Sequence, residues 1–175
     1  GCYPEKHAFS NDFDQEIDLL KQKIKLYENF VQLLQEEWIC VSKYSYDSLQ
    51  EITAKKEDQV MQMQALENSR SCLMKKIAEK LQVRQSSLTL KKLIQIKGNS
   101  RRNNLARCRQ NLLSQIKEIN EWSGKVKGLM DHSALSLKKS LAFIHSADEK
   151  ENSPYLANGQ VMQGRVEGRM LSMDV

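Results

Sequence analysis

The 175-residue chain is poor in the residues that interrupt helices. It has 2 prolines and 7 glycines, and aromatic residues make up only 6% of it. It also lacks any run close to the roughly 18 apolar residues that a membrane-spanning helix needs. Long helices are therefore easily accommodated, and any core must consist of Leu, Ile, Val and Met. This composition favours an elongated helical bundle over a compact sheet protein.

Residue types that carry catalysis or bind metals are scattered along the chain. His7, His132 and His145 lie too far apart for a metal site or a base–nucleophile pair, and the four cysteines form no CxxC pair. No glycine-rich loop follows a strand pattern. We therefore expect no enzyme activity, no metal and no cofactor. The thiols should be reduced, with Cys40 and Cys72 half-buried.

The first helix is marked by an apolar stripe whose members lie three or four residues apart. Asn11 or Asp12 is expected to cap it. A second apolar row beside the stripe implies contact with more than one neighbouring helix. We expect the stripe to be buried against both other long helices. It comprises Phe13, Ile17, Leu20, Ile24, Tyr27, Val31, Leu34, Trp38 and Val41, and the second row comprises Leu19, Leu26, Phe30, Leu33, Cys40 and Tyr44.

A second long helix is predicted over residues 47–81, which contain no glycine or proline. Asp47 or Ser48 is the expected cap. Lys56 and Arg70 interrupt its stripe, and we expect their stems to lie along apolar neighbours while the charged heads reach water. The stripe comprises Leu49, Ile52, Val60, Met63, Leu66, Leu73, Ile77 and Leu81.

The connecting segments allow more than one interpretation. Residues 42–48 form either a turn or a kink, and a turn would make an antiparallel hairpin. Residues 88–97 alternate as a strand does, but without an evident partner strand we predict a short helix. A third long helix is expected from about Arg101 to His145. At Gly124 and Gly128 either this helix weakens or another backbone comes close.

The predicted fold is therefore all-α: an elongated antiparallel bundle of three long helices and one short helix over residues 1–147. A flexible C-terminal tail, residues 148–175, is expected to follow. The tail has too many glycines for a stable helix, yet it keeps apolar side chains. Such a segment either becomes ordered on a partner or is a plain disordered terminus.

The net charge of +5 is unevenly distributed. Between Glu79 and Glu118 there is no acidic residue, and this basic run can attract phosphates or an acidic protein surface. A nucleic-acid site is disfavoured for two reasons. No aromatic residues interleave with the basic residues, and no uninterrupted leucine-zipper helix follows them. The basic residues are Lys80, Arg84, Lys91, Lys92, Lys97, Arg101, Arg102, Arg107, Arg109 and Lys117.

Three segments resemble motifs of the FlgN family of flagellar export chaperones. The first resembles L-x-x-I-T-x-x-K-x-x-x-L-x-x-L-x-x-L-E-x-x-R, and the second resembles L-N-x-x-N-G-x-L, with Ser123 in place of the second asparagine. The third resembles the tail motif Y-G-x-x-G-Q, with Leu156 in place of glycine. The matching residues are Leu49, Ile52, Thr53, Lys56, Val60, Met63, Leu66, Glu67 and Arg70, then Ile119, Asn120, Gly124 and Val126, then Tyr155, Gly159 and Gln160.

The resemblance implies a cytoplasmic chaperone of type III export. It would bind hook–filament junction proteins of the FlgK and FlgL class and deliver them to the cytosolic domain of the flagellar export gate. Tyr155 is the expected contact with the gate. The expected client-binding residues are the apolar residues of the tail: Val161, Met162, Val166, Met170, Leu171 and Met173. The alternatives are a coiled-coil scaffold or adaptor unrelated to secretion and, third, a basic nucleic-acid-binding helical protein.

Overall fold

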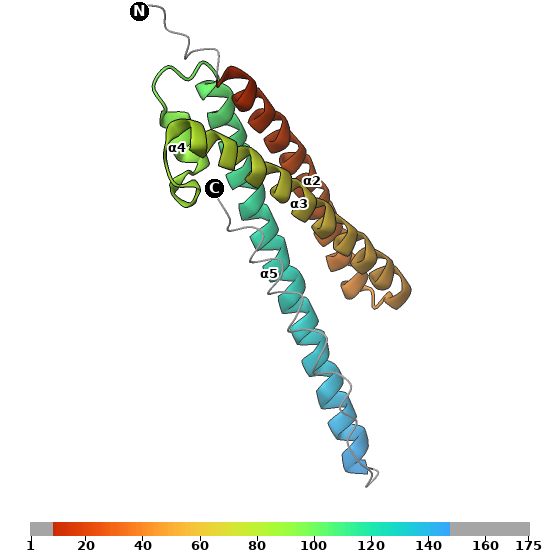
Figure 1. The fold of residues 1–175 in the computed structure, drawn as a ribbon. Helices are drawn as coiled ribbons and strands as arrows, with labels where there is room; N and C mark the ends of the chain where they lie inside the picture. Colours follow the sequence, from red (N-terminus) through yellow and green to blue (C-terminus); the bar gives the residue numbers. More distant parts are fainter. Residues whose placement is uncertain (1–8, 148–175) are drawn as a thin grey trace, which may run out of the picture.

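A computed structural model describes residues 9–147, and every regular element in that range is helical (Figure 1). The prediction of an all-α bundle with three long helices and one short helix is confirmed. In chain order the elements are α2 (Ser10–Ser42), α3 (Tyr46–Leu81), the single 3₁₀ turn η1 (Gln85–Ser87), α4 (Leu90–Gln95) and α5 (Arg102–Ala147).

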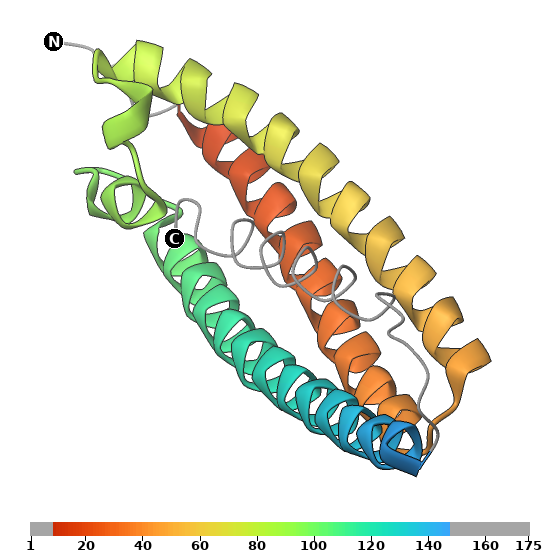
Figure 2. The same cartoon turned by 90° about the horizontal axis from the view of Figure 1, so that it is seen from below.

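Helix α2 occupies the centre of the arrangement. It packs along α3 on one side and along α5 on the other, and α4 packs against α5. Figure 2 shows α2 lying between the other two long helices. Asp14 meets Arg101 near the start of both α2 and α5, and Trp38 meets Trp122 farther along, so α5 runs parallel to α2.

The apolar stripe of α2 is buried as predicted except at Ile24, which is half-buried, and at Trp38. Phe13, Leu20, Tyr27 and Leu34 are almost fully covered, and the second row also contributes to the core. The expectation for Trp38 is wrong, because 39% of this residue stays exposed. Its indole packs edge-to-face against a single ring, that of Trp122, with 6.5 Å between the centroids.

Residues 42–48 reverse the chain, so α2 and α3 form an antiparallel hairpin rather than one kinked helix. The Ser45 N–H donates to the Cys40 carbonyl at 3.0 Å, and the Tyr44 N–H donates to the Val41 carbonyl at 3.2 Å. Tyr44 takes up the left-handed conformation, with φ of 54°. These two bonds and this conformation make a Schellman motif, which ends the helix and turns the chain.

The N-cap residues of α2 and α3 differ from those predicted. Helix α3 begins at Tyr46 with Ser45 as its N-cap, and α2 begins at Ser10 with Phe9 as its N-cap. Neither N-cap side chain bonds to the helix backbone. The Ser45 hydroxyl instead donates to the Ser48 hydroxyl at 2.9 Å. The capping predictions were therefore wrong by two or three residues, slightly more than the usual uncertainty of helix ends.

The segment that was ambiguous between helix and strand is helical. The Thr89 side chain caps α4 by accepting a hydrogen bond from the Lys92 N–H at 3.3 Å. Leu90 and Leu93 of α4 are fully buried, so this short helix covers the end of the core beside the start of α5. Gly98, with φ of 76°, then turns the chain into α5.

Helix α5 runs without a break through Gly124 and Gly128. A Cβ added at either glycine would meet nothing within 4 Å. Both expectations for these glycines, a weakened helix or a close backbone, are therefore wrong within the described part of the chain. They lie on a face of α5 that is open in this structure.

Tyr44 and Gln82, the two described non-glycine residues with positive φ, allow a test of how the helix C-termini affect stability. Gln82 ends α3 in the same motif that Tyr44 forms at the end of α2. This conformation costs an L-residue roughly 1–2 kcal/mol. Glycine avoids that strain, but it lowers the free energy of unfolding by about 0.4–1 kcal/mol because it increases the conformational entropy of the unfolded chain. Tyr44→Gly and Gln82→Gly should each raise the free energy of unfolding, measured in urea, by about 0.5–1 kcal/mol. Lys43→Gly, at a negative φ of −97°, should lower it; a gain there would contradict this account.

Candidate functional site

The residues assigned to partner binding from the sequence lie outside the described range. The expected gate contact, Tyr155, and the boundary at residue 148 fall beyond residue 147, as do the six expected client-binding residues Val161, Met162, Val166, Met170, Leu171 and Met173. These assignments stay predictions. The candidate surfaces described below are those that residues 9–147 form.

The charged members of the longest motif pair with α2. Lys56, Glu67 and Arg70 each face an oppositely charged side chain across the α2–α3 contact. All six buried charged residues of the described range lie along this contact. We call it the ionic seam; its pairs are Asp12–Lys80, Glu16–Arg70, Lys23–Glu67 and Glu37–Lys56.

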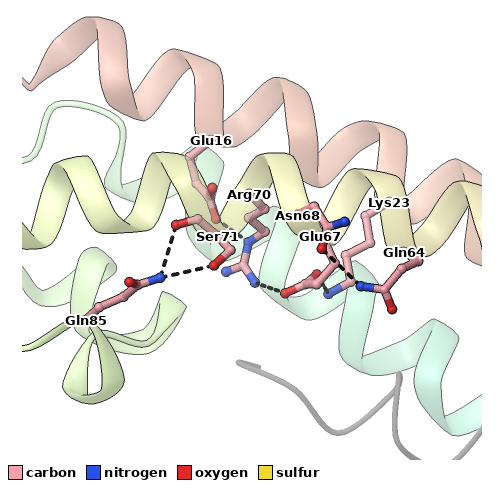
Figure 3. Close-up of polar contacts among 8 residues, drawn as sticks. All are labelled: Glu16, Lys23, Gln64, Glu67, Asn68, Arg70, Ser71 and Gln85. Atoms are coloured by element: carbon pink, nitrogen blue, oxygen red, sulfur yellow. Dashed lines mark hydrogen bonds and ion pairs between the residues drawn. The ribbon is translucent and has the colours of Figure 1, made fainter.

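Four charges of alternating sign form the middle of the ionic seam (Figure 3). Arg70 Nε lies 2.7 Å from Glu16 Oε1, and Arg70 Nη1 lies 3.7 Å from Glu67 Oε1. Lys23 Nζ completes the row at 3.2 Å from Glu67 Oε2. The expectation that the charged heads of Lys56 and Arg70 reach water is wrong, because both residues are buried and ion-paired with carboxylates of α2.

Burial acts against ionisation at this site. Desolvation raises the pKa of Glu16 even though Arg70 acts in the opposite direction. Desolvation likewise lowers the pKa of Lys23 despite the nearby Glu67. The stabilising contribution of Glu16 is therefore complete at acid pH and is lost as pH rises through its folded pKa. That of Lys23 is complete at alkaline pH and is lost as pH falls. Near neutral pH the desolvation of Glu16 and Lys23 therefore offsets part of the stabilisation from their ion pairs.

The ionic seam fixes the register of α3 against α2 more than it increases the free energy of unfolding. If α3 slid by one heptad in either direction, Glu16, Lys23 and Glu37 of α2 would each face an apolar side chain instead of its partner. An unpaired buried charge costs several kcal/mol, so the slipped arrangements are excluded. The residues seven positions from Arg70, Glu67 and Lys56 are, respectively, Met63 and Ile77, Val60 and Met74, and Leu49 and Met63.

The α2 side of the ionic seam was missed in the sequence because its residues are charged. Glu16, Lys23, Phe30 and Glu37 recur at intervals of seven, as a buried heptad row does. All four are buried. The signal that could have identified them is this spacing, together with the two basic residues that interrupt the stripe of α3.

The C-terminal part of α5 extends past the end of the α2–α3 hairpin (Figure 1). Val126 is its last buried residue. We call residues 129–147 the overhang, which at 1.5 Å per residue is roughly 28 Å long. Its exposed apolar side chains are Leu135, Leu137, Leu141, Phe143 and Ile144.

One face of the overhang has the spacing of a helix–helix seam. Apolar residues follow each other there at steps of four and three, which places them in line on a helix. Lysines outnumber acids around this stripe: Lys125, Lys127, Lys138 and Lys139 against Asp131. We call this face the overhang stripe; it consists of Met130, Ala134, Leu137, Leu141 and Ile144.

Aromatic side chains gather at the end of the hairpin beside the overhang. Trp38 and Trp122 contact each other, and Lys125 Nζ lies 4.3 Å from the centroid of the Trp122 ring. Tyr44 and Tyr46, in and after the turn, are 80% and 68% exposed. We call Trp38, Tyr44, Tyr46 and Trp122 the hairpin-tip patch.

A shallow groove follows the outer side of the hairpin between α2 and α3. Leu19, Leu26, Ala65 and Leu66 contribute apolar atoms to its longest section. Its edges carry both acidic and basic side chains and show no dominant sign of charge. The groove is thus a second helix-sized surface, but one with less exposed apolar side chain than the overhang.

The basic run contributes to the fold at two positions. Arg101 forms two bonds with Asp14, at 2.7 and 3.2 Å, and Lys80 pairs with Asp12. These contacts fasten the start of α2 to the start of α5 and to the end of α3. Part of the basic run therefore neutralises acids of this chain instead of forming an open site for phosphates.

The cysteines and acidic residues of residues 9–147 form no recognisable reactive or metal-binding site. Cys108 is buried, and burial raises the pKa of its thiol. Cys40 is half-buried as predicted, whereas Cys72 is exposed, which corrects the prediction for it. In residues 9–147 no cluster of His, Cys, Asp and Glu has the arrangement of a metal site. No helix of that range is long and apolar enough to cross a membrane.

Comparison with known proteins decides the family. The family model described as FlgN protein matches residues 12–163 of the 175. The chain belongs to the FlgN family. It is thus a chaperone of flagellar export, as the three motifs implied. No curated protein and no solved structure matches the chain.

The structure separates the roles of the FlgN motifs. The first motif supplies the α3 side of the ionic seam and is structural. The second motif, which includes Asn120 and Gly124, lies on α5 beside the hairpin-tip patch, where α5 leaves the hairpin. The family match continues beyond residue 147 and includes Tyr155.

The ionic seam predicts how the FlgN fold responds to substitution. Arg70→Met should lower the free energy of unfolding at pH 7 by about 3–5 kcal/mol, because Glu16 would remain buried without its main partner. The loss should shrink near pH 4, because burial raises the pKa of Glu16 and a protonated carboxyl needs no cationic partner. Glu16→Leu combined with Arg70→Met should recover most of it. Urea unfolding at both pH values measures these effects.

The exposed pair Lys55–Glu51 provides the matched control. Lys55→Met should change the free energy of unfolding by less than about 0.5 kcal/mol, since surface pairs contribute little. If Arg70→Met were equally mild at pH 7, the ionic seam would not be holding α3 to α2.

Proposed function

We propose that this FlgN protein acts in the cytoplasm, where it binds hook–filament junction proteins of the FlgK and FlgL class through their amphipathic terminal helices. It then delivers them to the cytosolic domain of the flagellar export gate. The observation that carries the proposal is the overhang: about five turns of helix with an apolar stripe that no other described element covers.

The overhang is incomplete as a folded element. Isolated helices are only marginally stable in water and usually gain their stability from packing of an apolar face. Leu137, Leu141 and Ile144 of the overhang stripe remain exposed. An amphipathic helix of a client offers a matching face, and burial of each large side chain contributes about 1.5–3 kcal/mol before the costs of association.

The charges near the overhang stripe indicate which helix fits best. Lys138 and Lys139 follow Leu137 directly, and Lys125 and Lys127 lie just before the overhang. Complementary charge increases the rate and the specificity of association. A client helix with acidic residues beside its apolar face is therefore favoured.

The tail completes the proposed division of roles. Its apolar residues between Val161 and Met173 would extend the client contact beyond α5. Tyr155 would contact the export gate, since a tyrosine combines a large apolar face with a hydroxyl. The support for both roles is the family resemblance and the residue types.

Substitutions in the overhang test the client site. Leu137→Asp combined with Leu141→Asp should weaken binding of a purified FlgK-class protein at least tenfold, measured by calorimetry, because charge would replace the apolar contact. Leu135→Asp combined with Phe143→Asp introduces the same two charges off the stripe and should change the affinity less than about twofold. Unchanged affinity in the double variant would exclude the overhang as the client site.

Two further variants test the tail. Deletion of residues 160–175 should weaken client binding, whereas Tyr155→Ala should leave it unchanged and weaken binding to the purified gate domain. If the deletion left the client affinity intact, the helices alone would hold the client. If Tyr155→Ala left gate binding intact, delivery would depend on other residues.

A further inference from the structure

The hairpin-tip patch concentrates large aromatic surface in a chain that has little of it. Both tryptophans of the protein and two of its five tyrosines lie there. Trp38, Tyr44 and Tyr46 remain exposed. In the described residues the buried core takes up three other aromatic side chains. Tyrosine and tryptophan are the residues that most often dominate the energy of protein interfaces.

Tyr44 is the most informative member of the patch. Its left-handed conformation is one that glycine adopts without strain, and its side chain is 80% exposed. The fold thus bears the strain of a bulky residue here and gains almost no burial from it. Gln82 bears the same strain without an aromatic side chain, so it is the exposed ring of Tyr44, and not the strain alone, that points to a role outside the fold.

The overhang stripe lacks the kind of residue that usually dominates an interface. It contains three large aliphatic residues, one alanine and one methionine, without an aromatic or arginine side chain. Tight interfaces generally place such residues at their centre, surrounded by weaker contacts. A client helix held by the stripe alone would therefore bind weakly.

The patch and the stripe adjoin each other on α5. Trp122 lies about one turn before Val126, and Met130 follows about one turn later. Trp122 also contacts Trp38 of α2. A helix that lies along the overhang stripe and extends toward the hairpin therefore ends at these rings.

We propose that the hairpin-tip patch is the anchor of the client site, where its aromatic rings bury the end of the same client helix that lies on the overhang. The inference rests on the proposed function and adds the residues that dominate the affinity. The occupant is an apolar helix end of the client, chosen because Trp122 of the patch lies in line with Met130 of the stripe on α5, with the buried Val126 between them, and because both surfaces are apolar.

Tryptophan fluorescence tests the position of the client directly. The probe is a synthetic amphipathic peptide with the terminal sequence of a FlgK-class protein, made without tryptophan. Because both tryptophans of the 175-residue chain lie in the patch, binding should shift their emission to shorter wavelength. The midpoint should match the dissociation constant from calorimetry. Heat of binding with unchanged emission would overturn the inference and leave the proposed function standing; no binding at all would overturn both.

A pair of glycine variants tests the energetic role. Tyr44→Gly should raise the melting temperature yet weaken peptide binding about tenfold. Gln82→Gly relieves the same strain at the opposite end of α3 and should leave the affinity unchanged. Equal affinities in the two variants would overturn the inference. So would a change of oligomeric state in Tyr44→Gly at constant affinity, since the patch would then serve a second copy of the chain.

Discussion

The buried pair between Glu16 and Arg70, with its neighbours in the ionic seam, is the constraint on which the rest of the structure depends. A helix pair held only by Leu, Ile and Met could slide by a heptad at little cost. The alternating charges exclude this, because each shift leaves buried charges without partners. Desolvation opposes ionisation of both Glu16 and Lys23, which indicates that the seam gives register rather than net stability.

A fixed hairpin explains why α5 can remain partly uncovered. Helix α2 ends and α3 begins at the turn around Tyr44, and α4 covers the opposite end of the core. Helix α5 needs α2 only as far as Val126, and the overhang beyond it is free to receive another helix. In the proposed function this combination provides a rigid body and an apolar helix face that a client can cover and later leave.

Periodicity predicted the helices because burial depends on spacing, and it identified the core of α2 almost completely. Charged core residues were missed since Lys56 and Arg70 look like interruptions until Glu37 and Glu16 are seen opposite them. Trp38 was predicted to be buried because its position fits the stripe, but spacing cannot show where a neighbouring helix diverges. The overhang could not be predicted either, since its apolar residues look the same whether a helix covers them or not. The motif match identified the family, whereas the tail residues depend on resemblance alone.

Hydrogen–deuterium exchange of the full-length protein, with and without a bound FlgK-class client, tests the central claim most directly. Without client, amides of residues 129–147 should exchange faster than those of α2, because no described element packs on this part of α5. With client, protection should rise along the overhang and around Trp122, while α2 and α3 along their outer groove stay unchanged. Protection that instead rose along the α2–α3 groove, with the overhang still exchanging freely, would contradict the account.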